Sequence, residues 1–288
     1  MEKFLDVTIA GLLLGGLYAL IAMGMSLQYG VARVFNIAHG EFIMLGAMAT
    51  WTLFTVFHIS PLVSIAICGP IAFILGYILH RTMFKTLQSK SAHQGIFESN
   101  SMLASFGLMF VIQNIAFLAW GPEIRTYSYL MDTVSIGGAL FGARRLVTLG
   151  FAVAIGVIFY IFLARTRIGK AIRAAGQDPS TAGLMGVNIN GVLALCFGLG
   201  AAMAGIAGVL ISMCYPDYAN MGQEYLTVAI IVVVLGGLGS IPGSFIGGFI
   251  LGIIGSVVAF YDPGLTMVAY YAIFIILLLV RPKGIMGV

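Results

Sequence analysis

The longest stretches of this sequence carry no charged side chain. Residues 7–32 form such a run, 26 residues long. A helix needs about 20 apolar residues to cross a bilayer, whereas the apolar core of a signal peptide has only about 7–15. We therefore interpret this run as a retained membrane helix. Only 8% of the chain is charged, 60% is hydrophobic and the mean hydropathy is +1.07, so the whole chain is predicted to be an integral membrane protein.

Two of the apolar runs are too long for a single span. Residues 42–79 contain no Asp, Glu, Lys or Arg but are interrupted at 58–61, where Pro61 disfavours a continuous helix. Residues 225–261 are interrupted in the same way at 239–243. The prediction is an all-α polytopic membrane protein forming one transmembrane domain over 1–288, with nine helices, or eight if 225–239 crosses only half of the bilayer. The expected spans are 7–29, 38–57, 61–80, 101–120, 146–164, 190–214, the two halves of 225–261, and 265–280.

The basic residues are distributed unevenly between the connections. Nine alternating spans put ten Lys and Arg residues on one side and four on the other. Because Lys and Arg concentrate in cytoplasmic loops, the loops 81–100 and 165–190 and the C-terminus are expected in the cytoplasm, and the N-terminus outside. The ten are Arg33, Arg81, Lys85, Lys90, Arg165, Arg167, Lys170, Arg173, Arg281 and Lys283; the four are Lys3, Arg125, Arg144 and Arg145.

Glycine is abundant, with 38 residues, and recurs at helical spacing. Small residues allow helices to approach closely in lipid, which predicts a tightly packed bundle. A functional alternative is that smooth helices slide or line a path. The residues expected to pack helices together are Gly198, Ala201, Gly205, Gly208, Gly243, Gly247, Gly248 and Gly252.

Few polar groups fall at membrane depth. His39 and Glu41 stand where the second span begins, and an ionisable group there suggests a function by default. The structural alternative is that Asn36 caps this helix and that Glu41 suits the positive end of its dipole. Gln113 and Asn114 lie within the fourth span and are expected to form interhelical hydrogen bonds. All five are candidates for the pathway or for gating.

Several functional classes lack their signatures. The sequence contains no phosphate-binding G-x-x-x-x-G-K-[ST] motif, no metal-ligand spacing and no serine nucleophile elbow, so an enzyme is not favoured and no cofactor or metal is expected on this chain. The isolated Cys68, Cys196 and Cys214 are typical of small buried residues. A net charge of +4, dispersed along the chain, does not suggest nucleic-acid binding.

The longest basic interruption in the second half is 165–190. Thr166–Ala175 is expected to extend the fifth helix, and Gly176-Gln177 to interrupt it. Asp178 and Pro179 are then typical of an N-cap followed by the first helical residue, and Gly186 of a helix stop. This pattern predicts a short helix held between two hinges, although a plain solvated turn would have a similar composition.

Three segments resemble one known family. They are the stretch 15–42, including Asn36-Ile-Ala-His-Gly-Glu-Phe; the stretch 173–188, beginning Arg-Ala-Ala-Gly-Gln-Asp-Pro; and the stretch 235–247, beginning Leu-Gly-Gly-Leu-Gly-Ser-Ile-Pro-Gly. They resemble, in the same order, the branched-chain amino-acid permeases of bacterial ABC importers, in particular the shorter of the two permease types. Urea-importer permeases share the Asn-x-Ala-His-Gly-Glu pattern, so another small polar solute remains an alternative, as does a stand-alone channel.

The resemblance implies a set of partners in the bacterial inner membrane. These are a second, longer permease subunit, two cytosolic ATPase subunits that carry ATP and Mg²⁺, and a periplasmic substrate-binding protein received by the outer loops 121–145 and 214–224. It also implies that a cytoplasmic coupling segment contacts an ATPase subunit. The corresponding residues are Gly176, Gln177, Asp178, Pro179, Ser180, Thr181, Ala182, Gly183, Leu184, Met185 and Gly186.

Overall fold

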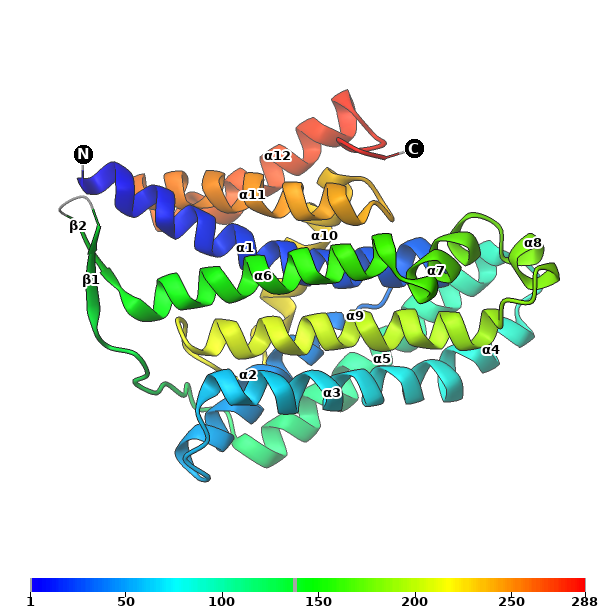
Figure 1. The fold of residues 1–288 in the computed structure, drawn as a ribbon, viewed down its shortest axis with the longest axis horizontal. Helices are drawn as coiled ribbons and strands as arrows, with labels where there is room; N and C mark the ends of the chain where they lie inside the picture. The colour runs from blue at the N-terminus through cyan, green and yellow to red at the C-terminus, as the bar shows by residue number, and fades with distance from the viewer. Residues whose placement is uncertain (1, 137–138, 288) are drawn as a thin grey trace.

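Helices make up most of the computed structural model, which describes residues 2–136 and 139–287 (Figure 1). In chain order they are α1 (Glu2–Ala32), α2 (His39–Thr55), α3 (Pro61–Leu79), the π-helical turn η1 (His80–Phe84), α4 (Lys85–Lys90), α5 (Gln94–Trp120), α6 (Ala143–Arg165), α7 (Arg167–Gln177), α8 (Pro179–Leu184), α9 (Ile189–Ser212), α10 (Met221–Gly236), α11 (Ile241–Tyr261), the 3₁₀ turn η2 (Pro263–Leu265) and α12 (Thr266–Val280). Strands β1 (Thr133–Ile136) and β2 (Ala139–Gly142) pair antiparallel between α5 and α6.

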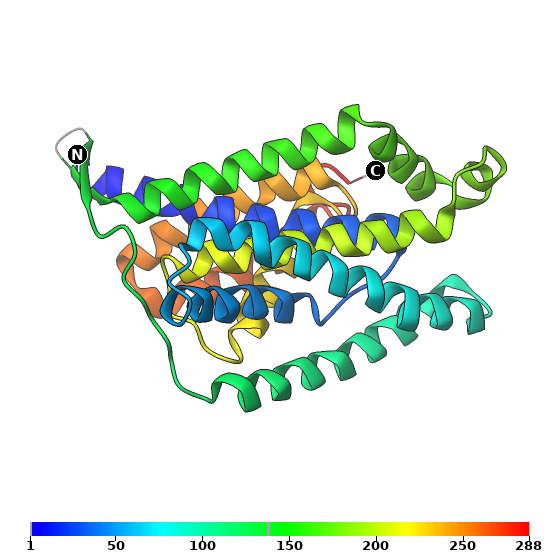
Figure 2. The same cartoon turned by 60° about the horizontal axis from the view of Figure 1, so that its bottom comes forward.

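Helices α1 and α9 form the centre of the bundle. α1 packs along α11 and α9, and α9 in turn packs against α2 and α3. α5 runs along one edge of the bundle (Figure 2), where it packs chiefly against α2 and α4. The N-terminus and the hairpin lie at one end of the long axis and α8 at the other (Figure 1). We call these the hairpin end and the α8 end.

The predicted class, an all-α polytopic membrane protein, is confirmed. Seven of the described helical segments are long and apolar enough to cross a membrane. The spans expected at 38–57 and 225–239 correspond to the shorter helices α2, with 17 residues, and α10, with 16 residues. The structure also adds the β-hairpin, which the sequence analysis did not anticipate.

The stretch 81–100 is mostly helical and not the loop that was expected. η1 and α4 continue α3 as far as Lys90, and α5 already begins at Gln94. The polar residues do not end the helix, because the hydroxyls of Thr82 and Thr86 donate to carbonyls of the preceding turn. No proline or glycine lies between His80 and Lys90 to interrupt it.

Glycines lie where the helices approach most closely. A Cβ added at Gly248 would come within 2.5–2.8 Å of Ala19, and one at Gly205 would come within 2.8 Å of the Ala72 side chain. The other six residues predicted for packing have similarly close neighbours on α1, α2, α3 or α10: Gly198, Ala201, Gly208, Gly243, Gly247 and Gly252.

Candidate translocation and coupling sites

The chain between α1 and α2 turns back into the bundle. Arg33 adopts the left-handed conformation, with φ of 54°, directly after α1 ends at Ala32. Residues 33–36 are non-helical, and α2 begins at His39. The imidazole of His39 donates from Nε2 to the carbonyl of Ile21 at 3.1 Å. Ile21 lies eleven residues before Ala32, about 16 Å along α1 at 1.5 Å per residue. α2 therefore starts deep inside the bundle.

The polar groups at this junction are buried. His39 is 0% and Glu41 1% exposed, and neither Nδ1 of His39 nor Oε2 of Glu41 has a hydrogen-bond partner. Glu41 lies in the first turn of α2, as predicted. Its carboxylate therefore faces the positive end of this helix, which favours the charge.

Asn36 does not cap α2, contrary to the structural alternative above. The N-cap residue is Ala38, which makes no side-chain capping bond. The amide of Asn36 instead donates to Gln28 at 3.3 Å, and the Gln28 amide donates to the carbonyl of Phe197 at 3.0 Å. Asn36 is thus held by α1 and indirectly by α9, an arrangement that local sequence cannot specify.

Ser105 on α5 fixes the same non-helical segment. Its hydroxyl accepts from the backbone N–H of Ile37 at 3.1 Å and lies 3.2 Å from the carbonyl of Phe35. A short polar side chain therefore satisfies backbone groups that the break in the helix leaves without partners. The sequence analysis missed Ser105, which no local signal distinguishes from other serines.

A second broken segment stands opposite the first. α9 ends at Ser212, and the chain returns through 213–220 to begin α10 at Met221. Gly222 packs directly on the backbone of Gly40, so the two short helices begin side by side. α2 then runs towards the hairpin end, where Thr52 accepts from the Trp120 indole at 2.8 Å. α10 runs the other way, and Gly236 packs on Gly243 at the start of α11.

Two short helices that begin side by side inside the bundle and run in opposite directions resemble the half-helices of secondary transporters, which surround the solute site near the bilayer midplane. The structure brings Asn36, His39 and Glu41 together at this centre. Gln113 and Asn114 lie separately on α5. The Asn114 amide donates at 2.8 Å to Phe110 within its own helix, and not to another helix as predicted.

The connection from α5 to α6 covers the hairpin end. Arg125 and Asp217 exchange two backbone hydrogen bonds, at 2.8 and 2.9 Å, which tie this connection to the segment before α10. Tyr127 bonds Ser212 at 2.8 Å and stacks at 4.8 Å on Phe54, at the end of α2. The Arg125 guanidinium lies 4.1 Å over the Trp51 ring. These contacts join the connection between α5 and α6 both to the end of α2 and to the segment between α9 and α10.

Asp217 is fully buried beneath this connection, and both of its carboxylate oxygens lack partners. Burial raises its pKa from 3.8 to about 8. The folded state therefore keeps a proton that the unfolded chain releases above pH 3.8, and stability declines as the pH rises from 3.8 through 8.

We expect Asp217→Asn to stabilise the protein increasingly over this range. Its melting temperature in detergent should match wild type near pH 4 and exceed it by at least several degrees at pH 8. Thermal unfolding followed at both pH values measures this difference. Asp132→Asn, which changes an exposed carboxylate in the same connection, is the control. An equal response of the two variants at pH 8 would contradict the assignment.

The basic interruption 165–190 forms two helices beyond the α8 end of the bundle. Thr166, with extended backbone, separates α6 from α7, and its hydroxyl accepts from the N–H of Gly169. The structure therefore has a break at Thr166 that was not expected, and a second break at Asp178, directly after the expected interruption at Gly176-Gln177. The predicted extension of α6 is wrong because Thr166 acts as an N-cap, and such a cap starts a new helix.

α7 is fastened to the end of α6. The guanidinium of Arg173 donates to the carbonyls of Leu163 and, at 3.3 Å, of Ala164. These carbonyls belong to the last turn of α6, which lacks intrahelical donors and attracts cations. α7 also packs against α1, where Gly176 faces Val31. Movement of α7 is thus linked to both membrane helices.

The short helix α8 begins and ends at residues predicted from the sequence. The Asp178 carboxylate accepts from the N–H groups of Ser180 and Thr181, at 2.9 and 3.2 Å, and Pro179 is the first helical residue. Gly186 has φ of +85° and terminates the turn. Ala182 is buried, whereas Leu184 and Met185 are 89% and 82% exposed. α8 therefore presents two large apolar side chains away from the bundle.

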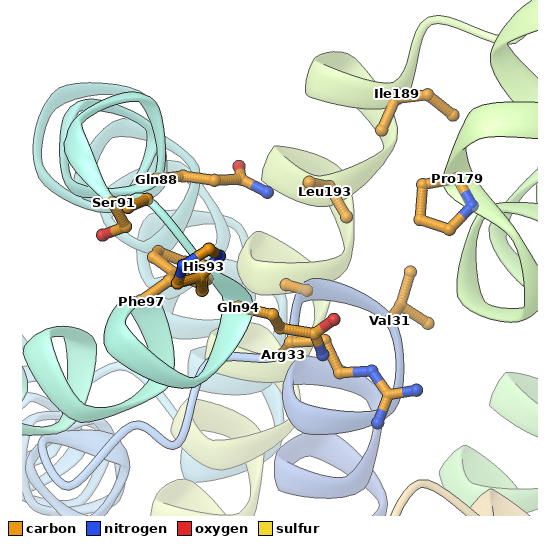
Figure 3. Close-up of a pocket in the computed structure, with 12 residues that line it drawn as sticks. Val31, Arg33, Gln88, Ser91, His93, Gln94, Phe97, Pro179, Ile189 and Leu193 are labelled. Carbon is orange, nitrogen blue, oxygen red and sulfur yellow. The ribbon is translucent and has the colours of Figure 1, made fainter.

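A cavity of about 270 Å³ lies beside α8 (Figure 3). Pro179 and His93, the latter from the turn before α5, border it on opposite sides. Val31 and Arg33 at the end of α1 and Leu193 on α9 line it between these two. Open space therefore separates Pro179, at the start of α8, from the ends of the membrane helices.

Comparison with known proteins identifies the family. A sequence model described as "Branched-chain amino acid transport system / permease component" matches residues 7–280. The high-affinity branched-chain amino acid permease BraD of Pseudomonas aeruginosa is 31% identical, and LivH of Salmonella typhimurium is 33% identical; each alignment covers 99% of this chain and 96% of the relative. A probable LivH permease of Methanocaldococcus jannaschii is 27% identical over 94% of this chain. The chain belongs to the permease component family of branched-chain amino acid transport systems.

Proposed function

We propose that this chain is the shorter permease subunit of an ATP-driven importer for branched-chain amino acids. The match to the family over residues 7–280 is the observation that carries this proposal. The whole chain then forms one permease domain, and a second, longer permease subunit completes the pathway across a bacterial inner membrane. Two ATPase subunits carry ATP and Mg²⁺, and a periplasmic binding protein delivers the solute at the hairpin end.

The α8 end is cytoplasmic in this proposal. The end of α1, the turn between α4 and α5, and helices α7 and α8 lie at or towards that end (Figure 1), and the segments there and the C-terminal tail carry Arg33 and the basic residues of 81–90, 165–173 and 281–283. The starts of α1 and α6 and the connection from α5 to α6, at the hairpin end, carry the other four basic residues of the sequence, Lys3, Arg125, Arg144 and Arg145. The bias follows the positive-inside rule. The N-terminus is then periplasmic, and the connection 121–142 faces the binding protein.

Residues 176–186 couple ATP hydrolysis to transport. The exposed Leu184 and Met185 form an anchor that inserts into an apolar groove on an ATPase subunit, as the apolar face of an amphipathic helix does when it binds a partner. Arg173 and Gly176 connect this anchor to the ends of α6 and α1. Closure of the ATPases would thus pull on helices that border the central breaks.

Reconstitution tests the assignment. The purified chain should hydrolyse no ATP and, alone in liposomes, should carry no leucine. Co-expression with the two ATPases and the longer permease should yield a stable complex that takes up leucine when binding protein and ATP are supplied. Leucine flux through the chain alone would contradict the proposal and favour a stand-alone facilitator. Uptake of urea but not leucine by the complex would assign another solute.

A further inference from the structure

A hollow lined by polar and apolar side chains lies on the outer surface of α10 and α12. Its volume is about 310 Å³, and its lining residues are Asn220, Gln223, Glu224, Thr227, Met267 and Tyr271. Asn220, Gln223 and Glu224 are exposed, although α10 begins at Met221 and includes the latter two. The structure therefore moves Glu224 out of the outer loop 214–224, in which the sequence analysis had placed it, and into the first turn of a helix.

This hollow lies at membrane depth. Gly222 packs against Gly40, and the neighbouring His39 bonds Ile21 in the middle part of α1. Thr227 is five residues beyond Gly222, so about 7.5 Å of helix contains the polar groups. Lipid cannot solvate a carboxylate here. The Tyr218 hydroxyl interacts with one side of the Glu224 carboxylate, and the rest of the group needs water, a solute or another protein.

The other outward faces at this depth are different in kind. α6 exposes apolar side chains such as Ile158, at 65%. On α5, the exposed Asn114 bonds to its own helix, an arrangement compatible with lipid. Among the described residues of the spanning helices, only Glu224 is an exposed carboxylate so far from both helix-bundle ends. The start of α10 is therefore poorly suited to lipid, whereas the neighbouring α12 exposes apolar side chains such as Val268, at 60%.

We propose that this hollow borders the solute path, closed on its open side by the second permease subunit, and that Glu224 binds the ammonium group of the transported amino acid. The inference rests on the proposed function. The side chains of Asn220 and Gln223 line the same hollow, and their amide N–H groups can donate to the carboxylate of the same zwitterion. Met267 and Tyr271 supply apolar surface for the aliphatic side chain.

Charge removal at Glu224 tests the binding role. Glu224→Gln keeps size and hydrogen bonding, and in the complete transporter it should raise the KM for leucine about tenfold, the effect of losing one charge-assisted hydrogen bond. The matched control is Glu98→Gln, a partly exposed glutamate in the second turn of α5, which should leave KM unchanged. If the unmodified complex takes up no amino acid, the proposed function fails. If it does and both variants behave alike, only this inference fails.

Thiol labelling tests the path itself and does not depend on the Glu224 variant. Cys68, Cys196 and Cys214 are first replaced by alanine, and Thr227→Cys is compared with Ile158→Cys. A water-soluble trimethylammonium methanethiosulfonate needs a hydrated thiolate, so it should modify position 227 at least about tenfold faster than position 158. Leucine with binding protein should slow labelling at 227. Equal rates at the two positions would overturn the inference.

Discussion

Replacing Asp178 and Pro179 by glycines is expected to leave ATP hydrolysis intact while leucine uptake falls towards background. The substitution removes the carboxylate that accepts from Ser180 and Thr181, and it removes the proline that fixes the first helical residue. α8 then loses its defined start. A movement of the ATPase subunit at Leu184 would be absorbed by the flexible segment before α8 and would not reach α7. Because coupling between sites is typically worth 5–150-fold, uptake per ATP should fall roughly a hundredfold. Parallel assays of ATPase activity and [³H]leucine uptake in proteoliposomes measure the ratio.

The connection between α11 and α12 supplies a matched control. Asp262-Pro263 has the same chemistry, since the Asp262 carboxylate accepts from the N–H of Gly264 at 2.8 Å and Pro263 begins η2. The same glycine pair placed there should leave uptake per ATP unchanged. Equal uncoupling by both replacements would show general damage and would remove the support for α8 as the coupling element.

A second control separates the shape of α8 from its charge. Hydrogen bonds, chiefly from the Ser180 hydroxyl, lower the pKa of Asp178 from 3.8 to about 2. Its capping contribution is therefore complete above pH 3.8 and is lost only as the pH falls through 2. An asparagine at this position still offers a cap oxygen, so Asp178→Asn should couple normally between pH 5 and 8. Strong uncoupling by this variant would assign the role to the charge.

The bounds of α8 were predictable because they depend on neighbours in sequence. Asp178, Pro179 and Gly186 each act within three or four residues, through a cap, a fixed φ and a left-handed turn. The interruption before Pro61 follows from the same local chemistry. Family resemblance then supplied what local chemistry could not, namely the expectation that this segment couples to an ATPase, and the solute class.

The two broken helices were not predictable in the same way. The segment before His39 contains no proline, and its departure from α1 is stabilised by groups far along the chain, Ser105 and Phe197 among them. An apolar helix also looks alike whether it begins at the surface or at the middle of a bilayer. The depth of Glu224 therefore emerged only from the packing of Gly222 on Gly40.

The close contact between α2 and α9 should tolerate almost no added volume. At Gly46 an added Cβ would lie on the carbonyl oxygen of Gly205, and 2.9 Å from its carbonyl carbon, so backbone and not a flexible side chain would have to move. Overpacking of this kind typically costs about 1–3 kcal/mol, and more when two backbones must separate. We expect Gly46→Ala to lower the melting temperature in detergent by several degrees, and Gly46→Val to leave little folded protein in the membrane.

Gly150 makes the opposite case on an exposed face of α6. A Cβ there meets nothing within 4 Å, so Gly150→Ala adds helix propensity without a clash. Alanine is better than glycine in a helix by up to about 1 kcal/mol, and the variant should melt at or slightly above the wild-type temperature. Both substitutions add the same methyl group to a helix, so any difference between them comes from what surrounds it. If the Gly46→Ala and Gly150→Ala variants had the same melting temperature, α2 and α9 would not be in direct backbone contact. That contact holds α2 at the centre of the bundle.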